Sequence, residues 1–524
     1  MFRLPRFFLF CLPMILPLKT LADSAAATQW WADVSALAND GMEGRLTGSP
    51  GYNRAASYVI SRLKAEGLKP AGINGYLQPV AFEQQVVDQD KSHAELAAAD
   101  GSSMPIKVGD QMLITAGQGP RPKSVDAPLV FIGYGLHLPK QSHDDFAGDL
   151  KGKIVVVLSG GPADLSGALK SNARSERNRE LGRLGALGII SLTTPKQVEI
   201  VWERQKLLAR GPGMYLADKK LRDNGKPFFA ATFDPSQSEM LFQGSGHSFA
   251  ELTALADASK PLPLFQLPFR LKASVVASYS RLTSPNIAAK LEGSDPTLKS
   301  EYVAVSAHLD HLGIGAPING DRVYNGAMDD ASGVATVLDI AHRLKQGPPL
   351  RRSVLFLLFT AEEKGLLGST YYAKKPTVPK ASIVADLNFD MPLPLWPLKT
   401  VYAPGQEESS LGDDAKAVAA SQELEMVPDP LPDRNVFIRT DQFSFVREGI
   451  PALVFKFGFA KGTPEFQIEH DWRANRYHSP SDDLDQPVMK EEAVKLDDFV
   501  AALAARVANA DERPAWLPDS VFRK

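Results

Sequence analysis

Five short polar motifs in the second half of the sequence could supply metal ligands and acid–base groups. Four of them adjoin apolar runs or a helical pattern: His308 and Asp310 after 303–307, Asp329 and Asp330 before 332–345, Glu362 and Glu363 after 353–359, and Asp390 after 382–388. Ligands of open α/β sheets bind beyond the carboxyl ends of strands, so we expect these side chains to meet at one edge. Imidazole and carboxylate groups are ligands that zinc accepts. The motifs therefore predict a zinc site in an α/β sheet.

Each motif alone also has a purely structural interpretation. An aspartate after a strand commonly caps a turn, a glutamate pair is commonly a solvated surface, and Asp329 with Asp330 could cap the following helix. The fifth motif, at 477–482, reads Tyr-His-Ser-Pro-Ser-Asp and adds His478. The ordered series favours one shared site over five unrelated structural roles.

Apolar strands alternate with amphipathic helices after Pro285, and these elements must position the motifs. We expect strands at 303–307, 353–359, 382–388 and 452–457, and helices at 332–345, 413–423 and 491–508. This alternation is typical of a mostly parallel sheet covered by helices on both faces. The predicted fold class is therefore α/β.

The chain of 524 residues is too long for one ordinary core and indicates two domains. Residues 127–271 contain glycine-bounded apolar runs and no catalytic motif, which predicts a smaller, separately packed module. The expected division is a signal peptide at 1–22, the catalytic domain at 23–126 and 272–524, and the inserted module at 127–271.

The N-terminus has the pattern of an export signal: Arg3 and Arg6, an apolar run at 7–18, and Ala22 before the expected cleavage site. Cleavage would remove Cys11, the single cysteine, and would exclude disulfides and thiolate zinc sites from the mature chain. We therefore expect a periplasmic or secreted protein without stable membrane insertion. An uncleaved anchor remains the alternative, although the run is short for a membrane span.

The charge balance argues against a polyanionic partner. The sequence has 58 basic and 61 acidic residues, a formal charge of -3, and no conspicuous basic stripe. Nucleic-acid binding is therefore not expected.

The ordered motifs resemble those of the co-catalytic zinc exopeptidase family, which includes bacterial leucyl-type aminopeptidases and glutamate carboxypeptidase II. The inserted module resembles a protease-associated domain through the segments 130–135 and 144–153. This resemblance implies the zinc exopeptidase fold with two zinc ions. Asp329 would bridge the ions, Glu363 and His478 would complete one site, and His308 and Asp390 the other.

The resemblance also implies catalytic roles for residues that are not ligands. Glu362 would be the general base that takes a proton from a metal-bridging water and returns it to the leaving amine. The Asp310 carboxylate would accept the second ring N–H of His308, and Tyr477 would donate to the tetrahedral oxyanion.

Three further residues have two interpretations each. His311 could be a ligand, but the family pattern uses the first histidine, His308. Arg439 and Asp441 resemble the family's substrate-side loop, and a structural salt bridge explains them equally well.

Together the motifs predict a zinc-dependent aminopeptidase that acts on peptides. The alternatives are a carboxypeptidase of the same family, a mononuclear zinc glutaminyl cyclase on this fold, and a receptor-like binding protein that has lost catalysis. A serine hydrolase has little support because the sequence contains no Gly-x-Ser-x-Gly elbow.

Overall fold

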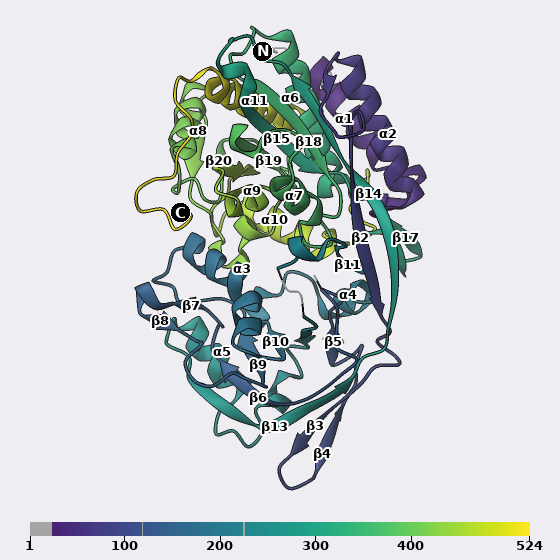
Figure 1. Ribbon diagram of the computed structural model, residues 1–524, viewed down its shortest axis with the longest axis vertical. Coiled ribbons are helices and arrows are strands. Elements are labelled where there is room, and N and C mark those ends of the chain that lie inside the picture. The colour runs from purple at the N-terminus through teal and green to yellow at the C-terminus, as the bar shows by residue number, and fades with distance from the viewer. Residues whose placement is uncertain (1–23, 118, 224–225, 524) are drawn as a thin grey trace, which may run out of the picture.

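The computed structural model describes residues 24–117, 119–223 and 226–523. The predicted signal peptide, residues 1–22, lies outside the described residues. The chain forms two parts, each built on its own eight-stranded sheet, and the upper part in Figure 1 holds both α1 and α11, the first and last described helices. Among the described residues, none of the helices combines the length and hydropathy that crossing a bilayer would require.

The first sheet carries the strands that lead to the predicted motifs. Its strand order is β11 (Gly213–Leu216), β2 (Leu77–Val87), β14 (Ala277–Leu291), β18 (Ser353–Phe359), β15 (Tyr302–His308), β19 (Ile383–Phe389) and β22 (Ala452–Val454), with β1 (Lys69–Pro70) beside β14. The pairings from β18 to β22 are parallel, whereas those from β11 to β18 are antiparallel. The predicted α/β class is confirmed, and the sheet is mixed, with its parallel half at the motifs.

Helices cover both faces of this sheet. All seven residues of β18 and all seven of β19 are buried, as expected for strands packed on both sides. Four helices pack in one layer: α1 (Ala25–Leu37), α2 (Pro50–Ala65), α6 (Ser332–Gln346) and α11 (Lys490–Asn509). The opposite layer contains α7 (Leu367–Lys374) and α9 (Gln442–Arg447).

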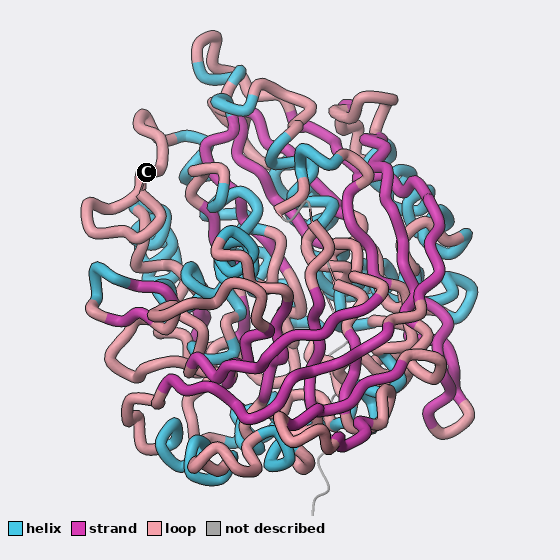
Figure 2. Tube along the Cα trace, turned by 60° about the horizontal axis from the view of Figure 1, so that its bottom comes forward, coloured by secondary structure: helices cyan, strands magenta, loops and turns pink. Residues whose placement is uncertain are grey.

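The second sheet forms the core of the smaller part. Its order is β4 (Ser103–Ile106), β3 (His93–Ala98), β13 (Leu264–Ser274), β6 (Ser124–Ile132), β9 (Ile154–Leu158), β10 (Gly188–Leu192), β12 (Phe229–Phe233) and β5 (Met112–Ile114). Helices α3 (Gly167–Arg183) and α5 (Phe249–Asp257) pack against it. Figure 2, turned so that this part comes forward, shows its strands running side by side across the molecule.

The predicted boundaries of the inserted module, 127 and 271, need correction. The second sheet recruits β3, β4 and β5, which all precede Ala127, and it extends to Ser274 at the end of β13. Residues 88–92 separate β2 of the first sheet from β3 of the second. The second sheet therefore begins at His93, the first residue of β3.

A two-stranded ribbon connects the two parts. Strands β2 and β14 pair without interruption over eleven residues of β2, from Leu77 opposite Ile287 to Val87 opposite Ala277. In Figure 1 this ribbon runs along one edge of the molecule from the first sheet to the second. Polar contacts reinforce the junction, among them Lys170 Nζ to Asp433 Oδ1 at 2.6 Å and Arg447 Nη1 to Asp223 Oδ2 at 2.7 Å.

The predicted catalytic-domain elements agree with the structure to within three residues, with one exception. The strand expected at 452–457 is divided into β22 and β23 (Lys456–Phe457), because β23 leaves the first sheet and pairs with β20 (Thr400–Tyr402). The remaining elements outside the two large sheets include α4 (Trp202–Leu208), α8 (Ser410–Ser421), α10 (Pro464–Asn475), β7 (His137–Leu138), β8 (His143–Asp144), β16 (Gly313–Ile318), β17 (Asp321–Tyr324) and β21 (Glu425–Val427).

Candidate metal centre

The predicted metal ligands meet at the carboxyl ends of the parallel strands. His308 is the last residue of β15, and Asp390 directly follows β19. Glu363 lies four residues beyond β18, and Asp329 lies in the turn before α6. His478 comes from the loop after α10. Segments that are far apart in the sequence thus converge on one edge, as the topology of a parallel sheet requires.

Asp329 lies between two histidines. One carboxylate oxygen is 3.2 Å from His308 Nε2, and the other is 3.3 Å from His478 Nε2. His478 Nε2 is also 3.3 Å from Glu363 Oε2. On the other side, His308, Asp329 and Asp390 offer ligand atoms that all lie within 4.8 Å of one another. One Asp329 oxygen therefore lies beside His308, and the other lies beside His478 and its neighbour Glu363.

His311 belongs to this cluster, although the sequence analysis favoured other ligands. Its Nδ1 lies 2.7 Å from Glu363 Oε1 and 3.9 Å from Asp329 Oδ2, and these three residues form the second group of candidate ligands. The ring is fully buried, and Gly326 packs so closely that a Cβ there would lie 2.6 Å from it. The His-x-x-His spacing of 308 and 311 was the available signal.

The buried donor atoms fit a zinc ion. The close polar neighbours of His308 Nε2, His311 Nδ1 and Glu363 Oε1 are other candidate ligands of the same cluster, and His311 Nε2 is buried without a hydrogen-bond partner. Buried polar groups are normally satisfied, so these atoms indicate a missing ligand. Imidazole nitrogens and carboxylate oxygens are the donors that zinc uses when thiolates are absent.

Burial and neighbouring charges shift the pKa values of Glu362 and Asp329 in opposite directions. Burial raises the pKa of Glu362 well above its ordinary value, and the negative charges of Asp390 and Glu363 reinforce that shift. Burial acts in the same direction on Asp329, but His308 and the two other histidines hold the Asp329 pKa well below its ordinary value. Asp329 is therefore the stable anion of the cluster, whereas Glu362 has a high affinity for a proton.

Asp310 contacts His308 as predicted, but through a different atom from the expected carboxylate. His308 Nδ1 lies 3.0 Å from the backbone carbonyl oxygen of Asp310, not from its carboxylate. The carboxylate instead accepts the backbone N–H of Glu362 at 3.0 Å and the hydroxyl of Thr47 at 2.9 Å. Asp310 therefore positions His308 through its main chain and the Glu362 segment through its side chain.

Two residues that hold the ligand loops were not assigned a role from the sequence. Asp482, the last residue of the fifth motif, accepts the backbone N–H groups of Met328 and Asp329 at 2.9 and 3.0 Å. Arg45 is fully buried and donates to the carbonyl oxygens of Leu309 and Asn325. Asp482 belongs to the fifth motif, so the sequence marks its position. The residues around Arg45 give no sign that it binds loops more than 260 residues away in the sequence.

Tyr477 and Arg439 lie together beside the cluster. Arg439 Nη2 donates to the Tyr477 hydroxyl at 3.2 Å, and Arg439 Nη1 lies 3.0 Å from Glu199 Oε1. Asp441 is buried and does not line either cavity at the cluster. Burial raises the pKa of Asp441 to about 7. The predicted substrate-side position thus fits Arg439 and not Asp441.

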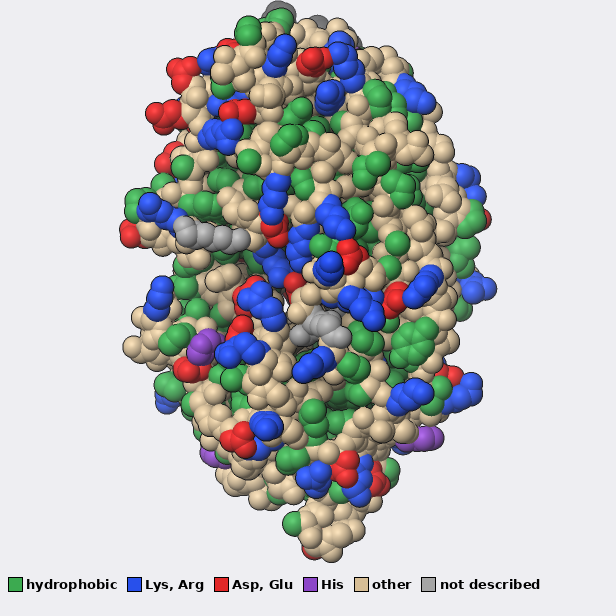
Figure 3. Space-filling model, in the orientation of Figure 1, with side chains coloured by type: hydrophobic (Ala, Val, Ile, Leu, Met, Phe, Trp, Pro, Cys, Tyr) green, Lys and Arg blue, Asp and Glu red, His purple; other side chains and the backbone are tan. Residues whose placement is uncertain are grey.

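Two cavities reach the cluster. A small one of about 40 Å³ is lined by Glu362, Asp390 and Tyr477, among others. A larger cleft of about 720 Å³ lies between the two parts of the chain, and both Glu363 and His478 line it. Figure 3 shows Lys and Arg side chains gathered across the middle of the molecule, where the two parts meet. The larger cleft is roomy enough for a peptide.

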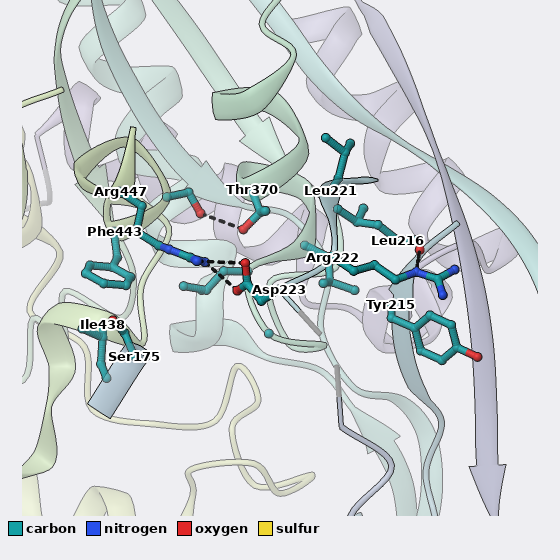
Figure 4. A pocket seen from close by; sticks show the side chains of 14 residues that line it. Ser175, Tyr215, Leu216, Leu221, Arg222, Asp223, Thr370, Ile438, Phe443 and Arg447 are labelled. Carbon is teal, nitrogen blue, oxygen red and sulfur yellow. Dashed lines mark hydrogen bonds and ion pairs between the residues drawn. The ribbon is translucent and has the colours of Figure 1, made fainter. Parts of the chain in front are cut away.

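A third cavity, of about 150 Å³, lies apart from the candidate ligands. The Asp223 carboxylate and Arg447 guanidinium form a two-pronged ion pair in it, with distances of 2.7 and 2.8 Å (Figure 4). Among its described lining residues, none is a candidate metal ligand, so we interpret it as part of the junction between the two parts.

Comparison with known proteins identifies the part of the chain that carries the metal centre. Residues 286–504 match the sequence profile described as Peptidase family M28. A probable leucine aminopeptidase 2 of Aspergillus oryzae is 38% identical over 110 residues, which are 21% of this chain and 20% of that protein. The probable lipoprotein aminopeptidase LpqL of Mycobacterium tuberculosis is 25% identical over 430 residues, or 80% and 70% of the two chains.

The alignments differ in how much of each relative they cover. The match spans about a fifth of the length of the Aspergillus oryzae protein and of a probable leucine aminopeptidase 2 of Aspergillus fumigatus. The solved structure of the aminopeptidase from Aneurinibacillus sp. strain AM-1 is 19% identical, with a TM-score of 0.54 over 93% of this chain and 95% of that one, and it shows the same fold. The segment at 286–504, which carries the candidate ligands, therefore matches peptidase family M28.

Proposed function

We propose that this protein is a zinc-dependent aminopeptidase with two zinc ions per chain, which removes N-terminal residues from peptides. The observation that carries the proposal is the position of Asp329, with one oxygen toward His308 and the other toward His478. A carboxylate in this position can serve two metal sites at once. The names of the relatives, which are aminopeptidases, support the same reaction.

In this proposal the chain provides ligands for both ions. His308 and Asp390 would hold one ion, Glu363 and His478 would hold the other, and Asp329 would contribute to both sites. The Asp310 carbonyl oxygen is placed to accept the Nδ1–H of His308, which leaves the Nε2 lone pair for the metal. Bound zinc would supply Lewis acidity for water and for the scissile carbonyl.

The remaining residues move protons and stabilise charge. A Glu362 oxygen takes the proton of the attacking water and passes it to the leaving amine, and its raised pKa suits that exchange. The Tyr477 hydroxyl donates a hydrogen bond to the developing oxyanion. Both residues line the small cavity at the cluster, where the scissile bond would lie.

The charges around the cavity favour the amino end of a peptide. A carboxypeptidase needs an available cation for the terminal carboxylate, usually arginine. The Lys and Arg side chains that line the cavity already pair with carboxylates: Arg439 with Glu199, Arg473 with Glu469 and Lys456 with Asp390. Four carboxylates line the same cavity, and this acidic surrounding supports the aminopeptidase over the carboxypeptidase.

The inserted part is proposed to be a protease-associated domain that restricts access to the site. Residues 197–200, 205 and 207–212 of this part line the large cleft, whereas the proposed ligands all come from the other part. The N-terminal export pattern supports a periplasmic or secreted location, where peptides from outside the cell would be the substrates.

Removal of zinc should abolish activity. We expect chelation of the purified protein to stop hydrolysis of aminoacyl reporter substrates, because the site has no other source of Lewis acidity for the carbonyl. Added zinc should restore the rate, and metal analysis should find two ions per chain. Full activity with at most one tightly bound ion would defeat the two-metal proposal and favour the mononuclear alternative.

Variants of the two competing histidines should separate ligand from neighbour. His478→Ala is expected to lose one of the two zinc ions and most activity, because His478 is assigned as a ligand. His311→Ala should keep both ions but bind one less tightly, since His311 then only orients Glu363. Zinc content after dialysis measures both effects. The opposite result would exchange the roles of His311 and His478.

A further inference from the structure

The inserted part places one carboxylate against the catalytic part beside the metal centre. Glu199 lies in the segment between β10 and α4, and its side chain is 17% exposed. Its two oxygens lie 3.0 and 3.1 Å from Arg439 Nη1. Arg473 Nη1 is 3.7 Å away and Arg434 Nε is 4.0 Å away. Three arginines of the catalytic part thus surround a single carboxylate of the insertion.

This environment keeps Glu199 ionised although it is largely buried. Burial acts to raise its pKa, but the positive charges of Arg439, Arg473 and Arg434 outweigh burial and lower the pKa to about 2. Glu469 balances one of the two remaining positive charges, since it pairs with Arg434 at 2.5 Å and also with Arg473. Arg434 and Arg473 therefore lie between two carboxylates, and Arg439 pairs with Glu199.

Arg439 connects Glu199 to Tyr477, because its guanidinium contacts both side chains. While Nη1 contacts Glu199, Nη2 donates to the Tyr477 hydroxyl oxygen at 3.2 Å. A guanidinium group only donates, so the tyrosine oxygen must accept, and its own hydrogen is left to donate elsewhere. Arg473 lies over the tyrosine ring at 5.0 Å from its centroid and restrains the ring plane. Tyr477 lines the same small cavity as Glu362 and Asp390.

We propose that Glu199 is a positioning residue for catalysis, which acts through Arg439 to turn the Tyr477 hydroxyl hydrogen toward the substrate. The inference rests on the proposed aminopeptidase function, in which Tyr477 stabilises the oxyanion. It gives the inserted part a role in the chemical step, in addition to restricting access. It also makes Glu199 the reason why Arg439 is not available to a substrate carboxylate.

A merely structural salt bridge would produce a different set of results. The junction contains a second charged pair of similar length, Asp223 with Arg447, which is remote from Tyr477 in the chain and lies in a separate cavity. Asp223→Asn breaks that pair and serves as the matched control. If Glu199 only joins the two parts, Glu199→Gln and Asp223→Asn should have similar effects on activity.

The experiment is a double-mutant cycle with zinc content and thermal stability measured for every variant. Tyr477→Phe should lower kcat by about 10²-fold, the effect of removing one oxyanion donor. Glu199→Gln should lower kcat by about 10-fold or more with little change in KM, Glu199→Asp should recover part of the loss, and Asp223→Asn should stay near the wild-type rate. In the Tyr477→Phe background, Glu199→Gln should have no further effect on kcat.

The outcomes separate this inference from the proposed function. Losses that multiply in the double variant, or equal losses for Glu199→Gln and Asp223→Asn, would overturn the positioning role while the aminopeptidase remains. A wild-type protein that binds zinc but cleaves no peptide with a free amino group would overturn both. An unchanged kcat in Glu199→Gln with normal zinc content would overturn the inference alone.

Discussion

Replacing Glu362 with glutamine is expected to lower kcat by about 10² to 10⁴-fold, the usual contribution of general acid–base catalysis. Glutamine keeps the shape of the side chain but cannot take up the proton. The backbone N–H of residue 362 would still bond to Asp310, so the ligand segment should keep its position. Zinc content measured beside the rate should therefore remain at the wild-type level.

Glu363→Gln is the matched control for that change, because it makes the same chemical substitution at the adjacent residue. Glu363 is assigned as a ligand, so this variant should lose zinc as well as activity. A nearly full rate for Glu362→Gln would show that the proposed mechanism is wrong, whatever the metal content. Equal zinc loss in both variants would mean that the two glutamates share ligand duty.

Acetylation of the peptide N-terminus is expected to stop cleavage completely within the limit of detection. The recognised group would be an ammonium ion beside Asp329, Glu362 and Asp390, and acetylation removes its charge. C-terminal amidation should have little effect, because the Arg and Lys side chains that line the cavity already pair with carboxylates. Mass spectrometry of the products of one peptide in free, acetylated and amidated forms makes the comparison.

The reverse pattern, with amidation blocking cleavage and acetylation tolerated, would assign the chain to the carboxypeptidase alternative. Arg439 would then be the first residue to test. Zinc-containing protein that binds all three peptides without cleaving any would favour the receptor-like alternative. The experiment thus distinguishes three functions that share one fold.

The ligand positions on the central strands could be predicted because local patterns determine them. His308 and Asp390 each follow an apolar run, and parallel strands place their carboxyl ends together. The roles of His311 and His478 could not be distinguished in this way. Their distances from Glu363 depend on the paths of two irregular loops. The family pattern alone included His478 and left out the buried His311.

Long-range pairing accounts for most of what the sequence did not show. The start of the insertion was placed too late because β3 joins the second sheet by pairing with β13, about 170 residues later in the chain. Arg45 and Glu199 have the same explanation. Each is an ordinary charged residue in its local segment, and its partners become neighbours only when distant loops meet.

The paired strands β2 and β14 have a mechanical consequence for how peptides are admitted. A ladder of eleven residue pairs is stiff, and it joins the two walls of the cleft along one edge, while charged contacts join them elsewhere. Such a frame leaves little freedom for the jaw-like closure that many enzymes use to enclose a substrate. If the protein is the aminopeptidase that we propose, the width of the cleft would be set when the protein folds, and it would limit the cross-section of the peptides that reach the metal site.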